Sequence, residues 1–184
     1  MSQTEVFIHH ELVDKCKRGE PRAQRELYNH YSKAMFNVAL RIVNDHFEAE
    51  DLVQECFVTA FTRIQTFRGD SSFGAWLKRI VVNRSINTVK RRKACFDPID
   101  DNVHGDHYEK EEEEEQQWGK FTVQDVKMAI GHLPEGYRIV FSLYMFEDFS
   151  HKEIADQLDI TESTSKSQLN RAKKKLKELL ILQR

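Results

Sequence analysis

Basic and amide side chains are concentrated in residues 67–93, the segment FRGDSSFGAWLKRIVVNRSINTVKRRK. Between Ser71 and Phe96 there is no acidic residue, but there are seven basic ones: Lys78, Arg79, Arg84, Lys90, Arg91, Arg92 and Lys93. Arg79, Asn83 and Asn87 recur at intervals of four, so they share one face of a predicted helix. Cationic groups bind phosphate oxygens and amides can pair with bases, so this face suits a nucleic-acid strand. A solvated basic helix face is the alternative interpretation.

The other side of the same predicted helix is apolar. Its apolar residues recur at three- and four-residue spacing: Phe73, Trp76, Leu77, Ile80 and Val81. This spacing predicts a helix that begins near Phe73 and packs one face against a core. A polar loop, residues 68–72, leads into it. The segment therefore combines an apolar face, which packs the helix against the core, with a solvent-exposed cationic face that can bind a nucleic-acid strand.

Charge is segregated along the chain, although the formal net charge of the 184 residues is only −2. Residues 97–115 contain ten acidic residues against Lys110, whereas residues 166–184 carry seven basic residues against Glu178. Nucleic-acid binders are expected to be basic. Two separate basic segments meet this expectation even though the average charge does not.

A second polar cluster lies on a helix predicted for residues 48–64. Its apolar stripe is broad: Leu52, Val53, Cys56, Phe57, Ala60, Phe61 and Ile64. Almost opposite that stripe lie Glu48, Asp51 and Glu55, with Gln54 at their edge. Such a cluster either keeps the surface soluble or docks a basic protein partner, for which complementary charge sets encounter rate and orientation.

The helical spacing of apolar residues along the chain predicts an all-α fold: two small helical domains, joined by an acidic flexible linker, the second containing a helix-turn-helix. The first domain covers residues 1–93 and includes a long amphipathic helix over residues 22–44. Residues 94–120 lack apolar periodicity and contain five consecutive glutamates, which repel one another, so they are predicted to be the linker. Residues 121–184 form the second domain.

The helix-turn-helix prediction depends on local signals in residues 150–182. Ser150 and Glu153 match a capping box, so a short helix begins after Ser150. A turn over residues 158–161 leads to a long basic helix, which Thr161 can cap, and the second helix of such a motif enters the major groove. Side chains able to contact base edges or phosphates occur near its start: Ser163, Thr164, Lys166, Ser167, Asn170 and Arg171. An ordinary amphipathic terminal helix is the alternative.

Several classes of function find no support in the sequence. There is no Gly-rich phosphate loop, no Cys/His ligand set and no nucleophile beside a base, so neither an enzyme nor a cofactor is expected. His104 and His107 alone do not predict a metal site. Cys16, Cys56 and Cys95 are far apart, and neither a signal peptide nor a membrane span is present. We therefore expect free thiols and a cytoplasmic protein with no membrane insertion.

With both halves considered, the sequence resembles the extracytoplasmic-function (ECF) group of bacterial RNA polymerase sigma factors, a branch of the sigma-70 family. In the first half the resemblance depends on EAEDLVQE at residues 48–55, FRG at residues 67–69 and WLKRIVVN at residues 76–83. In the second half it depends on LPEGYRIVF at residues 133–141 and SHKEIA at residues 150–155. It extends from about residue 12 to about residue 180, and it is the order and spacing of the motifs that make it specific.

The resemblance implies partners and site residues. The partners would be core RNA polymerase (the beta-prime clamp helices and the beta flap), promoter DNA and an anti-sigma factor. Polymerase would be bound by Glu48, Asp51, Gln54 and Glu55. The −10 element would be opened, with one base flipped into a pocket, by Arg68, Phe73, Trp76, Lys78, Arg79, Asn83, Arg84, Asn87, Lys90 and Arg91. The −35 element would be read by Ser163, Thr164, Lys166, Ser167, Asn170, Arg171 and Lys174.

The chain departs from the family pattern at three positions. Asp148 stands at the entry to the helix-turn-helix, where glycine is common, and Asp tolerates a left-handed backbone less well than Gly but better than most residues. Ser163 and Ser165 stand where Gly and Val are usual. A conventional helix-turn-helix regulator, with the first domain serving dimerisation, is the alternative function. The basic helix of the first half argues against a conventional regulator, because a dimerisation domain does not need a basic helix.

Overall fold

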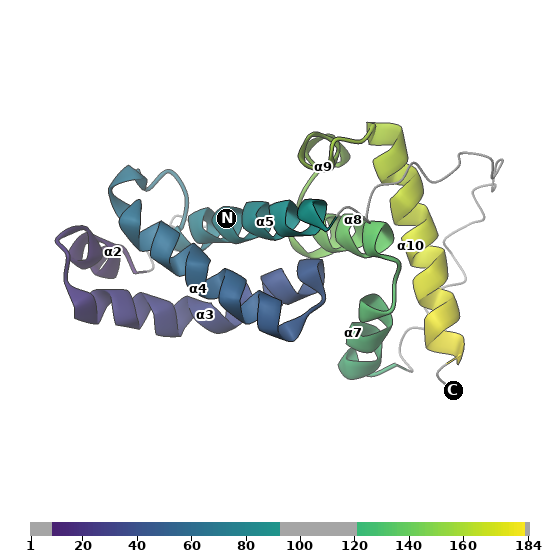
Figure 1. The fold of residues 1–184 in the computed structure, drawn as a ribbon, viewed down its shortest axis with the longest axis horizontal. Helices are drawn as coiled ribbons and strands as arrows, with labels where there is room; N and C mark the ends of the chain where they lie inside the picture. Colours follow the sequence, from purple (N-terminus) through teal and green to yellow (C-terminus); the bar gives the residue numbers. More distant parts are fainter. Residues whose placement is uncertain (1–8, 93–120, 183–184) are drawn as a thin grey trace. The chain divides into compact units, whose positions relative to one another are not determined.

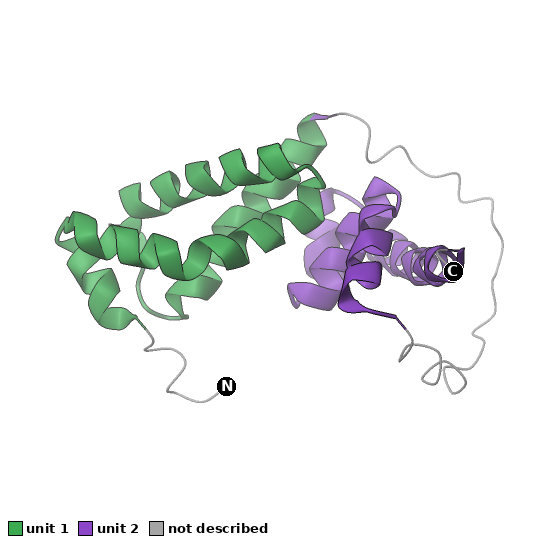
Figure 2. Ribbon diagram, turned by 90° about the horizontal axis from the view of Figure 1, so that it is seen from below, with its two compact units in different colours: residues 1–91 green, residues 92–184 purple. Residues whose placement is uncertain are grey.

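The computed structural model describes residues 9–92 and 121–182. These residues contain eight α-helices, one 3-10 helix and no strand, which confirms the all-α prediction. The chain divides into two compact units, Met1–Arg91 and Arg92–Arg184 (Figure 2). The predicted acidic linker, residues 94–120, lies outside the described residues, and the predicted domain boundaries stay a prediction.

The first unit is built from α2 (His10–Lys17), α3 (Pro21–Val43), α4 (His46–Thr62), η1 (Ile64–Thr66) and α5 (Phe73–Arg91). Helix α5 packs against both α3 and α4, which also pack against each other (Figure 1). Pro21 opens α3 at its first turn, where a missing N–H costs nothing. Asn44 ends α3 in the left-handed conformation, and the Asp45 carboxylate caps α4 by accepting from the Glu48 N–H at 2.8 Å.

The buried face of α5 is wider than the sequence predicts. Leu77 and Val81 are buried as expected, whereas Trp76 and Ile80 are only half-buried. Three further apolar side chains are almost fully buried: Val82, Ile86 and Val89. The reason is that α5 contacts two helices, α3 and α4, and so needs apolar side chains in two directions.

An aromatic cluster holds the start of α5 in place. The Phe73 ring lies 5.4 Å from Tyr31 of α3, 5.9 Å from Phe67 and 5.7 Å from Trp76, measured between ring centroids. Such offset and edge-on pairs are favourable beyond the area that they bury. The loop that precedes α5 is therefore anchored on both sides, by Phe67 before it and Phe73 after it.

The second unit is built from α7 (Val123–Gly131), α8 (Glu135–Phe146), α9 (His151–Leu158) and α10 (Glu162–Leu182). Helix α10 packs against the other three (Figure 1). The core of this unit includes the fully buried Ile139, Leu143, Ile154, Leu158 and Leu180. None of the helices described in either unit combines the length and the hydropathy needed to cross a membrane.

Local hydrogen bonds set the helix starts in the second unit. The predicted Ser150–Glu153 capping box is present, and Thr161 Oγ1 accepts from the Thr164 N–H at 3.0 Å, so α9 and α10 begin where the sequence predicts. Residues 159–161 form the turn between them, which confirms the helix-turn-helix. Asp148 is left-handed, with φ 61°, as expected for a residue in the place of a glycine.

Candidate nucleic-acid and protein-docking interfaces

Helix α5 presents a polar face along its length. Arg79, Asn83, Asn87 and Arg91 follow one another at intervals of four, and all four side chains are exposed. Lys78 and Lys90 are half-buried at the border of this face. The structure thus brings together, on one exposed surface, the cationic and amide groups that the sequence singled out. We call the four exposed residues the α5 polar face.

The loop before α5 is only partly as predicted. Arg68 is exposed, and Ser72 Oγ accepts from the Ala75 N–H at 3.2 Å, which caps the helix. Phe73, which the resemblance implies as a DNA contact, has a side chain that is only 1% exposed and is enclosed by the aromatic cluster. In this structure it presents no surface to a ligand and anchors the start of α5. Trp76 is half-buried in the same cluster.

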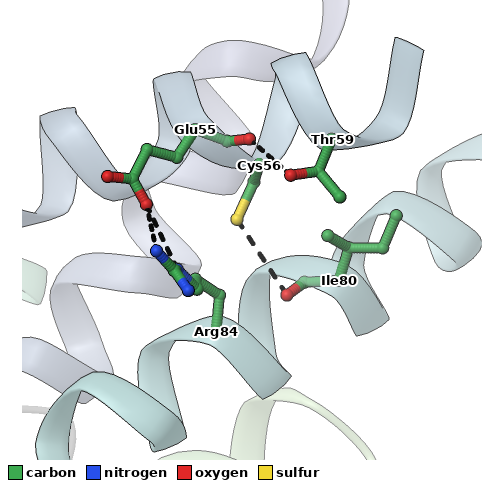
Figure 3. A network of polar contacts seen from close by, with 5 residues as sticks. All are labelled: Glu55, Cys56, Thr59, Ile80 and Arg84. Atoms are coloured by element: carbon green, nitrogen blue, oxygen red, sulfur yellow. Dashed lines mark hydrogen bonds and ion pairs between the residues drawn. The ribbon is translucent and has the colours of Figure 1, made fainter. Parts of the chain in front are cut away.

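Arg84 and Glu55, which were assigned to different partners, contact each other. The guanidinium of Arg84 donates from Nε at 3.2 Å and from the terminal nitrogen Nη2 at 2.5 Å to the same Glu55 carboxylate oxygen (Figure 3). Both side chains remain about half exposed. The contact joins residues 29 positions apart, so no local spacing signal could have predicted it. It links the outer, exposed face of α4 directly to α5.

The outer face of α4 is more apolar than the sequence analysis recognised. Asp51, Gln54 and Glu55 are exposed, whereas Glu48 is half-buried at the start of the helix. Phe47 and Val58 are 79% and 67% exposed. Asp51, Gln54, Glu55, Val58 and Thr59 line a shallow hollow. At 100° per residue, Phe47 and Val58 lie on the side of Asp51 and Gln54, a signal that was present in the sequence but missed. We call Phe47, Asp51, Gln54, Glu55 and Val58 the α4 docking face. It combines charge with apolar contact area, as protein interfaces do.

The two cysteines within the described residues are buried thiols. Burial raises the pKa of Cys16 to about 11 and that of Cys56 to about 12. The Cys56 Sγ also lies 4.0 Å from the Ile80 carbonyl oxygen, to which its hydrogen is donated (Figure 3). Since the thiolate is the reactive form, both groups should be inert in the folded protein.

We therefore expect slow alkylation of both thiols in a Cys95→Ser variant. At pH 8 Cys16 should react with iodoacetamide about a hundredfold more slowly, and Cys56 about a thousandfold more slowly, in the folded chain than in the chain unfolded in urea. The reason is that pKa values of about 11 and about 12, against the ordinary 9.0, leave that much less thiolate. Mass spectrometry of timed samples measures both rates. Equal rates in the folded and unfolded chains would show that these thiols are accessible and ionised.

Helix α10 presents an exposed polar stripe near its start. Ser163, Lys166, Asn170 and Lys174 are spaced by three, four and four residues, and all are exposed. We call these four residues the α10 stripe. Their types can contact base edges and phosphates, so the stripe has the composition of a recognition surface.

Three further predicted residues are half-buried beside the α10 stripe. Thr164 is occupied by the helix cap, because its hydroxyl lies 2.8 Å from that of Thr161. Ser167 Oγ donates to the Thr164 carbonyl oxygen at 3.0 Å, and Arg171 is half-buried. Lys166, although exposed, pairs with Glu162 at 2.8 Å in an i,i+4 contact. An exposed pair of this kind contributes little to stability, so Lys166 can exchange it for a phosphate.

No group of three or more possible metal ligands occurs in the part of the chain that the structure describes. His104 and His107 lie outside it. Among the part-buried polar contacts that the sequence did not predict, His151 of α9 lies 2.9 Å from Ser165 of α10.

Two helical units, one with an exposed cationic helix and the other with a helix-turn-helix, define a two-part DNA-binding protein. Comparison with known proteins supports this class. The family model for sigma-70 region 2 matches residues 27–95, and the model for sigma-70 region 4 matches residues 124–176. The RNA polymerase sigma-H factor of Pseudomonas aeruginosa is 32% identical over 180 residues, which cover 92% of each chain. The ECF RNA polymerase sigma-E factor of Escherichia coli is 29% identical over 172 residues, which cover 88% of each chain.

Solved structures show the same fold. The sigma factor RpoE from Bartonella quintana, in complex with the anti-sigma factor NepR, superposes with a TM-score of 0.53 at 25% identity, over 87% of this chain and 98% of that one. CnrH, in complex with the cytosolic domain of CnrY, gives a TM-score of 0.51 at 23% identity, over 93% of this chain and 96% of that one. The chain therefore belongs to the ECF group of the sigma-70 family of RNA polymerase sigma factors. As a sigma factor it is a regulatory subunit that binds core RNA polymerase and directs promoter-specific initiation.

Proposed function

We propose a division of this function among three surfaces. The α4 docking face (Phe47, Asp51, Gln54, Glu55 and Val58) binds the clamp helices of the polymerase. The α5 polar face and Arg68 hold the opened −10 element, and the α10 stripe reads the −35 element as duplex. The protein acts in the cytoplasm and has no catalytic activity, so strand opening is driven by binding free energy.

One observation carries this proposal: two exposed DNA-compatible faces occur in separate compact units, on α5 and on α10. A regulator that only reads duplex needs the second face and not the first. The first face is rich in amides as well as cations, which suits an unpaired strand whose bases are free to pair with side chains. The α4 docking face adds an exposed surface for a protein partner on the side of α4 opposite its buried residues.

We also propose regulation by an anti-sigma factor. The Bartonella quintana protein, which this chain matches over most of its length, was captured with such a partner. In the present chain the apolar side chains Phe47 and Val58 are exposed to water, and a bound protein would bury them. An anti-sigma factor that covered the α4 docking face would exclude polymerase from it.

Reconstitution with core polymerase tests the proposal against the alternative of a conventional regulator. The chain should co-elute with core polymerase in gel filtration, and the complex should start transcripts at promoters that the core alone ignores. A conventional regulator would bind promoter duplex but would not co-elute. Failure to co-elute would contradict the proposed docking.

Within the α10 stripe we expect two kinds of loss. Lys166→Ala should weaken binding to all duplexes alike and reduce the slope of log affinity against log salt by about one, because one phosphate contact is lost. Asn170→Ala should instead lower affinity by about 1–3 kcal/mol for the preferred duplex alone, because an amide reads a base edge. Fluorescence anisotropy with the preferred and a scrambled duplex, at several salt concentrations, measures both effects.

Lys127→Ala, an exposed lysine on α7 of the same unit, is the matched control and should change neither quantity. Equal losses on both duplexes for Asn170→Ala would remove it from base readout.

A further inference from the structure

The contact between α9 and α10 includes a polar interaction of His151 with Ser165, which we call the clasp. His151 is the first residue of α9, and its ring lies between α8 and α10. On one side the ring stacks on Tyr144 of α8, with centroids 4.6 Å apart and planes inclined by 23°. On the other side Nδ1 lies 2.9 Å from the hydroxyl oxygen of Ser165 in α10. The imidazole therefore joins the recognition helix to the helix that supports it.

Ser165 is on the inner side of α10 and is 0% exposed. Its neighbour Lys166 is exposed and belongs to the α10 stripe. Successive residues of a helix are separated by about 100°, so the direction of Ser165 determines the direction of Lys166 and, one turn further, of Asn170. A contact that holds Ser165 thereby holds the rotation of the whole stripe about the helix axis.

The contact is directional, whereas an apolar one would not be. A valine at position 165 would pack against its neighbours over a broad range of orientations. A hydrogen bond weakens steeply when its angle departs from linearity, so it restricts the rotation of α10 more closely. The ring, held at its edge by Ser165, is also held at its face by the stack on Tyr144.

The charge state of the ring supports this arrangement. Desolvation, and then the nearby Lys166 cation, lower the pKa of His151, while Glu162 acts in the opposite sense. At neutral pH the imidazole is therefore uncharged and keeps one nitrogen able to accept the hydroxyl hydrogen of Ser165. An uncharged His151 ring needs no acidic partner, so its contact with Ser165 does not depend on a further ion pair.

We propose that His151 is a positioning residue for duplex recognition: by clasping Ser165 it sets the rotation of α10, and with it the sequence specificity of the α10 stripe. This rests on the proposed function of α10 as the duplex-reading helix. In this arrangement His151 itself does not contact DNA. Its loss should change which sequences are preferred more than how tightly DNA is held, because the phosphate-binding cations remain.

A specificity measurement tests the clasp. The preferred duplex is first selected from a randomised pool with the full-length wild-type chain bound to core polymerase. The affinity ratio between that duplex and a scrambled one is then measured for each variant. His151→Ala should lower the ratio about tenfold, the size of one misplaced base contact, with affinity for the scrambled duplex unchanged. His151→Asn, which keeps a polar group near the position of Nδ1, should recover most of the ratio.

A double-mutant cycle shows whether the effect passes through Ser165. Ser165→Val and Ser165→Ala should each lower the ratio as His151→Ala does, and His151→Ala/Ser165→Val should be no worse than either single variant. His132→Ala, an exposed histidine at the end of α7, is the matched control and should keep the wild-type ratio. Thermal unfolding is followed for every variant. If His151→Ala does not fold, Ser165→Ala, which removes a single oxygen, provides the same test.

Three results would overturn the inference. An unchanged ratio in folded His151→Ala or Ser165→Ala would show that the clasp does not position α10. Losses that multiply in the double variant would show that the two residues act independently. If the wild-type complex shows no preference for any −35-like duplex, the proposed function of α10 fails and this inference fails with it.

Discussion

An Asn83→Ala variant should initiate poorly from a fully duplex promoter and recover substantially on a template with a premade bubble at the −10 element. Asn83 lies in the middle of the α5 polar face and is exposed. Within the described parts of the chain its side chain makes no hydrogen bond, so there the substitution removes none. Its effect would then come from the lost interaction with DNA.

The expected recovery follows from the free energy of strand opening. Extruding a paired base costs a few kcal/mol, and least when the base is already unpaired. If the Asn83 amide holds or supports an extruded base, its loss removes part of the binding free energy that offsets this cost. A few kcal/mol corresponds to a defect of about tenfold to a hundredfold on duplex. A premade bubble removes the cost and so removes most of the defect.

The comparison uses variants of the other DNA surface. Lys166→Ala and Arg171→Ala should show no comparable recovery on the bubble template, because the −35 element remains duplex in both templates. Initiation in vitro from the two templates, with saturating core polymerase, measures all three variants. Equal recovery of all three, or none for Asn83→Ala, would show that Asn83 does not take part in opening.

Reversing the charges of Asp51 and Glu55 should weaken binding to core polymerase by about tenfold or more while leaving the fold intact. Both side chains are exposed on the α4 docking face, and like charges placed across an interface cost several kcal/mol. Surface substitutions usually change stability by less than about 0.5 kcal/mol. Loss of the exposed Glu55–Arg84 ion pair adds at most about 1 kcal/mol. Binding and stability should therefore respond very differently.

The Glu55–Arg84 pair allows a sharper design than simple reversal. Glu55→Arg/Arg84→Glu exchanges the two charges, so the internal ion pair is retained while the docking face still carries a cation in place of Glu55. If the α4 docking face binds polymerase, this exchange should stay weak, as Asp51→Lys should. Glu26→Lys, an exposed glutamate on α3, is the matched control and should bind normally.

Affinity for core polymerase is measured by fluorescence with a labelled chain, and stability by thermal unfolding. Normal binding by Asp51→Lys and by the exchanged pair would exclude the α4 docking face from the polymerase contact. Recovery in the exchanged variant alone would show that the internal ion pair, and not the charge presented to the polymerase, is what matters at Glu55.

Sequence alone determined where several of the helices begin. The Ser150–Glu153 capping box, the Thr161 cap and Pro21 at the start of α3 are contacts or constraints within one helical turn. They do not depend on how helices pack, so they can be predicted from neighbouring residues. The exposure of Asn83 against the burial of Val81 follows equally from helical periodicity.

Periodicity does not say how many neighbours a helix has. Phe73 had features of both a core residue and a DNA contact, and only the packing of Tyr31, Phe67 and Trp76 around it makes it a core residue. The same reason explains why the buried face of α5 extends to Val82. A helix between two others buries more of its circumference than a single apolar stripe predicts.

Tertiary structure alone decided which polar groups meet. Glu55 pairs with Arg84 at a separation of 29 residues, and His151 with Ser165 at a separation of 14. In both contacts the partners lie on different helices, and their distance depends on how those helices are oriented. Burial of Ser165 makes the His151–Ser165 contact energetically important, because a polar group removed from water costs free energy unless it finds a partner within the protein.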